Sequence, residues 1–285
     1  MSISFEGIID KSVRGIAVGL AAAFLMLLPS SIRAADSAAT AAPMPGAVLS
    51  SGADPAKVLL AYAGINAQAE ITSPSGIHVY IDVHTPSALT TKPGPNDILC
   101  YTHNHYDHRN LPFQKSFPGR VIDQVAGEYV FGDLRIICIP GSHMEGDKIG
   151  PGVSSDYFYL IETGGLRILH TGDIGQLQYH PDQLKAFGGR IDLLFQEFDN
   201  GVANMSVENG LGFELLTQLG PRLIIPTHTS PAATEKLLAE YPALFSEQAT
   251  VELSASALPE KTTVLFTGQR AVDAWKANLE RGVKK

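Results

Sequence analysis

One hexapeptide decides the fold of this chain: His103-Asn104-His105-Tyr106-Asp107-His108. It follows directly after an apolar, strand-like run, residues 97–102. Imidazole and carboxylate groups bind divalent zinc, iron or manganese, and four of them rarely crowd into six residues for reasons of packing. The alternative interpretation is a polar, histidine-rich loop after a strand. We favour a metal site, which requires further ligands from elsewhere in the chain.

Three more potential ligands follow later strand-like runs. His143, Asp173 and His228 each come directly after a small or turn-forming residue. Such residues are expected where a chain leaves a sheet and turns at a site. Because sites in α/β sheets collect at the carboxyl ends of strands, the sequence predicts that these three side chains join the hexapeptide.

Strand-like and helix-like segments alternate along the chain, which indicates the α/β class. A length of 285 residues suits one large α/β domain or two small ones. The predicted strands are residues 77–83, 98–102, 127–131, 134–139, 157–162, 166–170, 191–198, 223–225 and 262–266. The predicted helices are residues 56–67, 183–187, 208–219 and 232–244.

Over roughly residues 56–270, these motifs resemble the metallo-β-lactamase superfamily. The H-x-H-x-D-H motif, a lone histidine after Pro-Gly, a Gly-Asp after a hairpin strand and a late strand-terminal histidine occur here in family order. The resemblance implies a four-layer αββα sandwich. In that fold two mixed β-sheets pack back to back, helices flank them, and the metal site lies along one edge.

The resemblance also implies two groups of ligands that share one bridging carboxylate: His103, His105 and His143 in the first, Asp107, His108 and His228 in the second, and Asp173 in both. A bridging aspartate departs from the β-lactamases that use a cysteine ligand. It is similar to the hydroxyacylglutathione hydrolase, lactonase and phosphodiesterase branches. Residues 204–206 and 225–228 look closest to the ascorbate-6-phosphate lactonase-like branch.

We therefore expect a binuclear metal-dependent hydrolase with two divalent metal ions, Zn²⁺ in the first instance. Because histidine and carboxylate ligands suit several metals, Mn²⁺ and Fe²⁺ stay open. A metal-bridging hydroxide would attack an ester- or lactone-type bond, and Asp107 would be both ligand and catalytic group, orienting the nucleophile or taking its proton. The alternatives are a phosphodiesterase and an iron-dependent oxidoreductase on the same scaffold. A protein that only stores metal is disfavoured, since a closed structural site needs only four ligands.

Four further residues are predicted to lie behind the ligands or in the pocket: Asp82, Tyr106, Glu197 and Asn204. Asp82 ends a strand and could receive an N–H from a ligand histidine, although a strand-end turn is the alternative. Tyr106 either meets the substrate or packs under its loop. Glu197 and Asn204 follow a strand and would border the cleft.

Composition limits the partners. The chain is acidic, with a formal net charge of -8, and its Lys and Arg residues form no block. Nucleic acid and anionic membranes are therefore poor partners, and we expect a small-molecule substrate. The oligomeric state is open. Cys100 and Cys138 lie inside apolar runs, where we expect buried thiols, although an exported protein could join them in a disulfide.

Residues 1–35 have the pattern of a signal peptide. Lys11 and Arg14 precede an apolar run of 13 residues, which suits a signal sequence better than a membrane span. Residues 36–55, rich in Ala, Ser, Pro and Gly, are predicted to be a flexible leader, and residues 56–285 the metallo-β-lactamase-fold domain. We expect an exported protein, periplasmic or secreted, with no stable membrane insertion after cleavage. An uncleaved anchor is the alternative.

Overall fold

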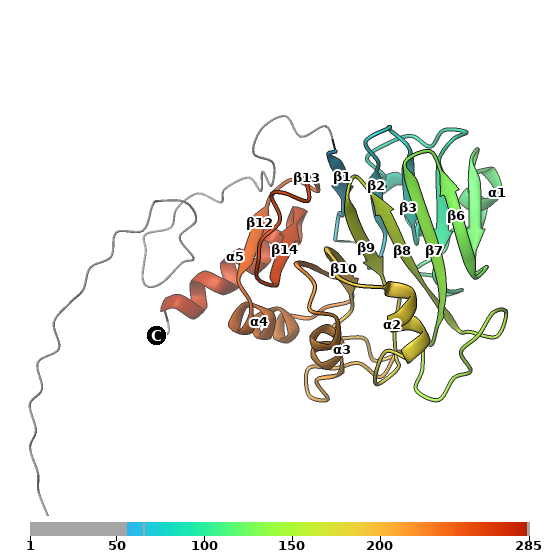
Figure 1. Ribbon diagram of the computed structural model, residues 1–285. Helices are drawn as coiled ribbons and strands as arrows, with labels where there is room; N and C mark the ends of the chain where they lie inside the picture. Colours follow the sequence, from blue (N-terminus) through green and yellow to red (C-terminus); the bar gives the residue numbers. More distant parts are fainter. Residues whose placement is uncertain (1–55, 65, 284–285) are drawn as a thin grey trace, which may run out of the picture. The chain divides into compact units, whose positions relative to one another are not determined.

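The computed structural model describes residues 56–64 and 66–283 (Figure 1). The predicted signal peptide, residues 1–35, and the predicted leader, residues 36–55, lie outside the described residues. Within the described part of the chain, no helix is both long and apolar enough to cross a membrane.

The first sheet contains six strands in the order β13-β1-β2-β3-β4-β5. Their bounds are β1 (Val58–Ala61), β2 (Ala69–Thr72), β3 (His78–Ile81), β4 (Ile98–Tyr101), β5 (Arg120–Asp123) and β13 (Thr250–Leu253). Neighbours from β13 to β3 run antiparallel, whereas β3, β4 and β5 are parallel. The sheet is therefore mixed.

The second sheet contains eight strands in the order β12-β14-β11-β10-β9-β8-β7-β6. Their bounds are β6 (Gly127–Phe131), β7 (Leu134–Gly141), β8 (Asp156–Thr163), β9 (Leu166–His170), β10 (Leu193–Gln196), β11 (Leu223–Pro226), β12 (Ala243–Ser246) and β14 (Thr263–Thr267). Strands β6 to β9 form an antiparallel meander, and from β9 to β12 all neighbours are parallel. This sheet is mixed as well.

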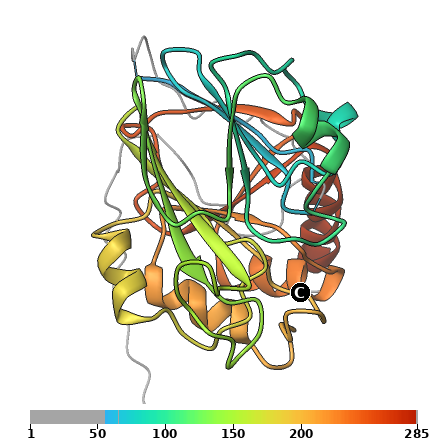
Figure 2. The same ribbon diagram turned by 90° about the vertical axis from the view of Figure 1, so that its right-hand side faces the viewer.

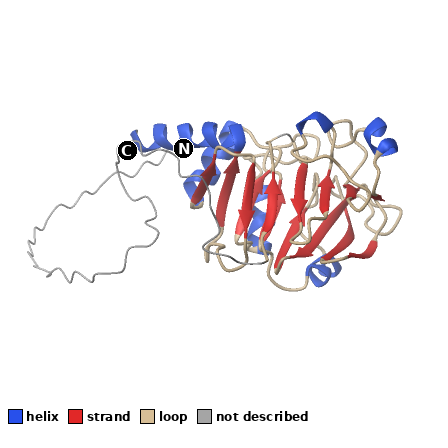
Figure 3. Cartoon of the chain, turned by 90° about the horizontal axis from the view of Figure 1, so that it is seen from above, coloured by secondary structure: helices blue, strands red, loops and turns tan. Residues whose placement is uncertain are grey.

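Helices lie outside the two sheets. Their bounds are α1 (Leu111–Ser116), α2 (Pro181–Phe187), α3 (Leu211–Leu219), α4 (Pro231–Glu240) and α5 (Gly268–Val283), with a short 3₁₀ helix, η1, at Pro86–Ala88. Figure 2 shows α1 on one side of the sheets and α2, α3 and α4 on the other. In Figure 3 the strands form the middle of the domain, with most helices at its margins. This is the predicted four-layer αββα sandwich.

Strand β8 shows why the sandwich holds together. Tyr159 and Ile161 point into the apolar layer between the sheets, whereas Phe158 and Leu160 point into the layer under the helices. Successive side chains of a strand face opposite sides, so a strand buried on both faces is apolar throughout. Burying each such side chain contributes about 1.5–3 kcal/mol. The two cysteines, as predicted, are buried free thiols in the layer between the sheets.

The helix predicted over residues 56–67 is wrong, because this segment contains strand β1. Val58 and Leu60 are fully buried between the sheets, while Leu59 is 39% exposed. β1 pairs with β2 on one side and with β13 on the other. Pairing with distant strands therefore overrides the helix-forming preference of the local alanines.

The helix predicted over residues 232–244 ends earlier than expected. Helix α4 ends at Glu240, and the last residues of the predicted range belong to strand β12. Pro242 disfavours a helical conformation for the residue before it, and Tyr241 is extended, with φ -127° and ψ 146°. The strands predicted over residues 127–131 and 166–170 have the predicted bounds, and the other predicted elements are present with shifted ends. Elements α1, α5, η1, β2, β5 and β13 form where the sequence predicts none.

Candidate metal centre

The predicted ligands leave the carboxyl ends of strands β4, β7, β9 and β11. Backbone hydrogen bonds connect the segment after β4 to the start of β8, and the segment after β7 to the segment after β9. The Tyr157 N–H donates to the Thr102 carbonyl oxygen at 3.0 Å, and the Gly175 N–H donates to the Ser142 carbonyl oxygen, also at 3.0 Å. The loops therefore meet at one edge of the sandwich, where α/β folds place their sites.

Gly172 gives Asp173 its place in the site. Its φ of +54° is a left-handed conformation. A Cβ atom at this position would lie 2.5 Å from the Asp156 Oδ1 atom and 2.7 Å from the Thr102 Cβ atom. Only glycine fits, because both the backbone conformation and the available space exclude a side chain.

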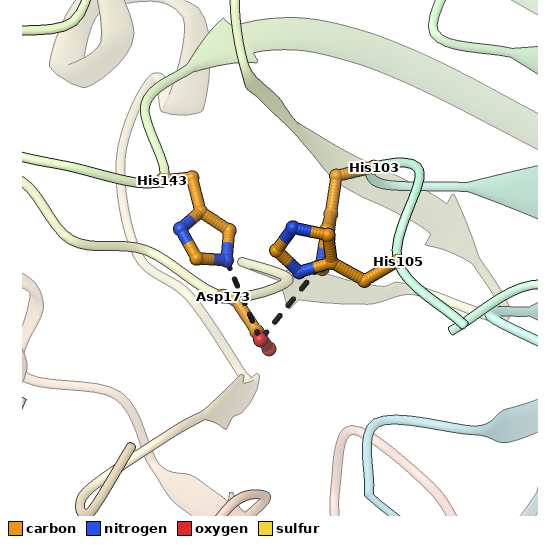
Figure 4. A group of neighbouring side chains, drawn as sticks. All are labelled: His103, His105, His143 and Asp173. Atoms are coloured by element: carbon orange, nitrogen blue, oxygen red, sulfur yellow. Dashed lines mark ion pairs between the residues drawn. The ribbon is translucent and has the colours of Figure 1, made fainter. Parts of the chain in front are cut away.

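The first group consists of His103, His105, His143 and Asp173, whose ligand atoms lie within 4.8 Å of one another (Figure 4). The Nε2 atoms of His103 and His143 are each 3.8 Å from the Asp173 Oδ2 atom. The ring of His105 lies 4.5 Å from that of His103 and 4.6 Å from that of His143, measured between centroids. Figure 4 shows these side chains converging from three separate loops.

The second group consists of Asp107, His108 and His228, again within 4.8 Å of one another. The Nε2 atoms of His108 and His228 are 3.1 Å apart. They lie 3.1 Å and 3.2 Å, respectively, from the Asp173 Oδ1 atom. Each oxygen of Asp173 therefore faces a different group, an arrangement that fits a carboxylate bridging two ions.

The side chains of the first group fit a divalent metal ion. The Nε2 atoms of His103 and His143 are buried and have no hydrogen-bond partner among the described residues. Buried polar atoms are nearly always paired, so two unpaired imidazole nitrogens that face one carboxylate are suited to bind a cation. Nitrogen and carboxylate donors suit Zn²⁺, Mn²⁺ and Fe²⁺ alike.

The electrostatics of the site also favour a cation. Burial, together with the neighbouring His108, lowers the pKa of His103 to about 4, so its imidazole is neutral at pH 7. Burial opposes ionisation of Asp173, but hydrogen bonds from the facing imidazoles, that of His108 first, hold its pKa well below the usual range. Burial likewise opposes a charge on His108, yet Asp82 and then Asp173 raise the pKa of His108 well above its ordinary value. The carboxylates thus draw positive charge to this position.

Asp82 contacts His108 of the second group directly and is connected to His103 of the first group through Thr102. Its Oδ2 atom is 2.8 Å from the His108 Nδ1 atom and accepts the Thr102 hydroxyl at 2.7 Å. That hydroxyl is 3.0 Å from the His103 Nδ1 atom. A carboxylate on the outer nitrogen of a ligand histidine fixes its tautomer and ring direction. The predicted contact between Asp82 and a ligand histidine is therefore present, and Asp82 is 1% exposed with φ +50°.

Glu197 lies behind Asp173 and is fully buried. Asn200 connects the two: its Nδ2 atom donates to Asp173 Oδ2 at 2.8 Å and to Glu197 Oε2 at 2.7 Å. The predicted Asn204 lies four residues further on, exposed and with φ +54°. The sequence offers no means to choose between these two asparagines, because the choice depends on how the loop folds back at the Asn200–Met205 bridge.

Tyr106 is 92% exposed, so it does not pack under its loop. Together with His105, Arg109 and Leu111 it lines an open cavity of about 440 Å³. A cavity of this size is in the range that small ligands occupy. The predicted pocket position of Tyr106 is therefore available to a substrate.

Two other residues near the ligands are absent from the sequence prediction. Asp156 is fully buried, its Oδ1 atom lies 3.4 Å from His103 Nδ1, and neither carboxylate oxygen has a hydrogen-bond partner among the described residues. Asn66 donates from Nδ2 to the Asp107 Oδ2 atom at 3.2 Å. Asp156 carries one signal, a charged residue directly before a long apolar strand. Asn66 carries none, since its contact is purely tertiary.

The chain belongs to the beta-lactamase superfamily. A family profile described as the "Beta-lactamase superfamily domain" matches residues 60–228, more than half of the chain. The match begins in strand β1 and ends at His228, so it contains all seven predicted ligands. Comparison with curated proteins gives no match.

Solved structures of the same fold include a protein of Thermotoga maritima assigned to the Zn-dependent hydrolases of the metallo-beta-lactamase superfamily. It has a TM-score of 0.52 and 17% identity, over 74% of this chain and 99% of that chain, which shows the fold alone. An isothiocyanate hydrolase from Delia radicum gut bacteria has a TM-score of 0.46 and 15% identity, over 73% of this chain and 95% of that chain. CmlA, a diiron β-hydroxylase from Streptomyces venezuelae, has a TM-score of 0.41 and 14% identity, over 62% of this chain and 45% of that chain.

Proposed function

We propose that this protein is a binuclear metal-dependent hydrolase that acts on an ester- or lactone-type bond of a small molecule. The observation that carries the proposal is the position of Asp173. Its Oδ1 atom faces His108 and His228, and its Oδ2 atom faces His103 and His143. A structural site is closed by four ligands, whereas two ions that share seven ligands leave positions for water and substrate.

Bound metal ions would supply an activated water and a Lewis acid for the oxygen of the scissile bond. The protein's own groups do the remaining work. Asp107, which is partly exposed and belongs to the second group, would orient the attacking water and take its proton. Asp82 and Asn200 hold His108 and Asp173 from behind, so the ligands are oriented before substrate arrives.

The cavity beside His105 and Tyr106 supports a small-molecule substrate. Lactones are the first class to test, because residues 204–206 and 225–228 resemble the ascorbate-6-phosphate lactonase-like branch. That branch, the choice of Zn²⁺ and the binuclear state are parts of the proposal. Phosphodiesters and iron-dependent oxidation are the alternatives.

The test begins with elemental analysis of protein purified without added metal. The zinc-loaded protein is then screened against lactones, thioesters, phosphodiesters and β-lactams. We expect two metal ions per chain and turnover of a lactone or ester. Asp107→Ala and His103→Ala should abolish that turnover, and unchanged turnover in either variant would refute the assignment. Iron together with oxygen uptake would favour the oxidoreductase.

We also propose that the protein is exported, with cleavage after Ala35, as the pattern of residues 1–35 suggests. Cell fractionation followed by N-terminal sequencing tests this proposal. A mature chain that begins at Asp36 in the periplasm or the medium supports it. A full-length chain that stays in the membrane fraction contradicts it.

A further inference from the structure

A chain of hydrogen bonds connects the last helix of the domain to the second ligand group. Arg270 lies in the first turn of α5. Its Nη1 atom donates to the Tyr62 hydroxyl at 3.0 Å and to the Pro226 carbonyl oxygen at 2.8 Å. Pro226 ends strand β11, two residues before His228. One guanidinium group therefore contacts both the N-terminal strand region and the segment that carries a predicted ligand.

Tyr62 passes this contact on. Its side chain is 2% exposed, and its ring meets Phe195 edge-on, with 5.8 Å between centroids. Burial raises the pKa of Tyr62 to about 12, although Arg270 partly opposes the shift, so the hydroxyl keeps its proton at pH 7. The hydroxyl donates to the Asn66 carbonyl oxygen at 2.6 Å and accepts from Arg270. The Asn66 carbonyl is therefore bound by Tyr62, which follows β1, and Tyr62 is in turn bound by Arg270 of α5.

Asn66 completes the connection to the site. Its φ of +42° is left-handed, a conformation that asparagine adopts more readily than other residues with a side chain. In this conformation its Nδ2 atom donates to the Asp107 Oδ2 atom at 3.2 Å. A carboxylate that accepts such a bond is restricted in rotation, so Asn66 fixes the direction in which Asp107 presents its other oxygen.

These contacts reach only one side of the centre. Asn66 contacts Asp107, and Arg270 contacts the segment that leads to His228. Asp107 and His228 both belong to the second group. None of these hydrogen bonds involves a side chain of the first group. In the first group, His103 is instead contacted by Thr102 and Asp156, and neither of these residues belongs to the chain of hydrogen bonds from α5.

We propose that Arg270, Tyr62 and Asn66 are positioning residues that shape the second ligand group, so that the second metal ion binds there. The inference rests on the proposed binuclear centre and assigns these residues no direct part in the chemistry. It predicts that metal binding occurs in two steps that depend on different parts of the fold.

The experiment compares single variants by metal titration of the full-length metal-free protein against a chromophoric chelator. Tyr62→Phe removes only the hydroxyl, Arg270→Met removes the guanidinium, and Asn66→Gly removes the amide while tolerating the positive φ. Each variant should weaken the second binding step about 10- to 100-fold and leave the first within about twofold of wild type. Because Tyr62 and Arg270 act in one chain, the Tyr62→Phe/Arg270→Met double variant should resemble the more impaired single variant.

Matched controls distinguish positioning from general stability. Arg222, like Arg270, is an arginine whose guanidinium donates to backbone carbonyls, in this case three of them. It lies directly before β11, at the end of that strand opposite His228. Tyr80 is a buried tyrosine whose hydroxyl bonds Thr91 on the other side of the first sheet. Arg222→Met and Tyr80→Phe should lower the thermal stability of the metal-free protein and leave both binding steps unchanged.

Two outcomes would overturn the inference alone: unchanged binding in the three variants, or an equal weakening of both steps. A wild-type protein that binds fewer than two metal ions would overturn the proposed function and the inference together. The wild-type titration separates these cases.

Discussion

Asp82→Asn is the substitution that best reveals how the site is held. Three donors face the Asp82 carboxylate: the His108 Nδ1 atom at 2.8 Å, the Thr102 N–H at 2.8 Å and the Thr102 hydroxyl at 2.7 Å. An amide of the same shape keeps one acceptor oxygen and turns an N–H₂ toward the remaining donors. A hydrogen bond to a charged group contributes about 1.5–3 kcal/mol, and at least one such bond is lost outright.

We expect Asp82→Asn to weaken metal binding about 10- to 100-fold, which corresponds to about 1.4–2.8 kcal/mol. The second step should lose more than the first, because Asp82 contacts His108 directly and His103 only through Thr102. Competition with a chromophoric chelator at pH 7 measures both steps. The expected asymmetry is the detail that the geometry predicts.

Asp97→Asn is the matched control for this prediction. Asp97 is also a buried aspartate whose oxygens accept two backbone N–H groups, those of His78 at 3.0 Å and Gly94 at 2.6 Å, but it lies at the opposite end of β4. This variant should lose stability and keep wild-type metal affinity. If Asp82→Asn also binds both ions with wild-type affinity, the reasoning about Asp82 is wrong.

Three further predictions concern neighbouring parts of the fold. Gly172→Ala should lower the free energy of unfolding by about 2–4 kcal/mol in chemical denaturation, because the new Cβ would lie 2.5 Å from a carboxylate oxygen at φ +54°; a loss below 1 kcal/mol would contradict this. The second prediction concerns Glu162: burial opposes ionisation of its carboxyl, but hydrogen bonds from two arginines on neighbouring strands hold its pKa below the ordinary 4.5. Its stabilisation, at most about 1 kcal/mol, is therefore present above pH 4.5 and lost as pH falls through the lower folded-state pKa. In chemical denaturation Glu162→Gln should be less stable than wild type at pH 7, and the difference should shrink as pH falls below 4.5; a difference that does not depend on pH would contradict this. Asn200→Leu should weaken both metal-binding steps, since Asp173 faces both groups, whereas Asn209→Leu in the same loop should weaken neither; a change confined to one step would argue against a shared carboxylate.

The sequence predicts those parts of the site whose residues can be identified from the local sequence pattern. Each of the seven predicted ligands is an imidazole or carboxylate in a loop that follows a strand-like run. Asp82 is found for the same reason, at the end of a β-branched run. The structure brings all of these side chains together, which is a geometric finding; their role as ligands stays a prediction that metal analysis must test.

What the sequence does not predict depends on contacts between distant segments. Asn66 reaches Asp107 only after β1 has paired with β2 and β13, and that pairing is itself missed because residues 56–67 favour a helix locally. Asn200 and Asn204 cannot be distinguished in the sequence, and only the folded loop directs Asn200 toward Asp173. Strand β12 is missed because it follows so closely after Pro242, inside what looks like one helical run.

We propose that two adjacent metal ions share Asp173. Electron paramagnetic resonance of the manganese-loaded protein can detect this sharing, because two Mn²⁺ ions bridged by one carboxylate give a spin-coupled signal. We predict two equivalents of bound Mn²⁺ with a coupled spectrum, and a weaker coupling or fewer bound ions in Asp173→Ala. A single bound equivalent, or two equivalents with the spectrum of isolated ions, would contradict the claim.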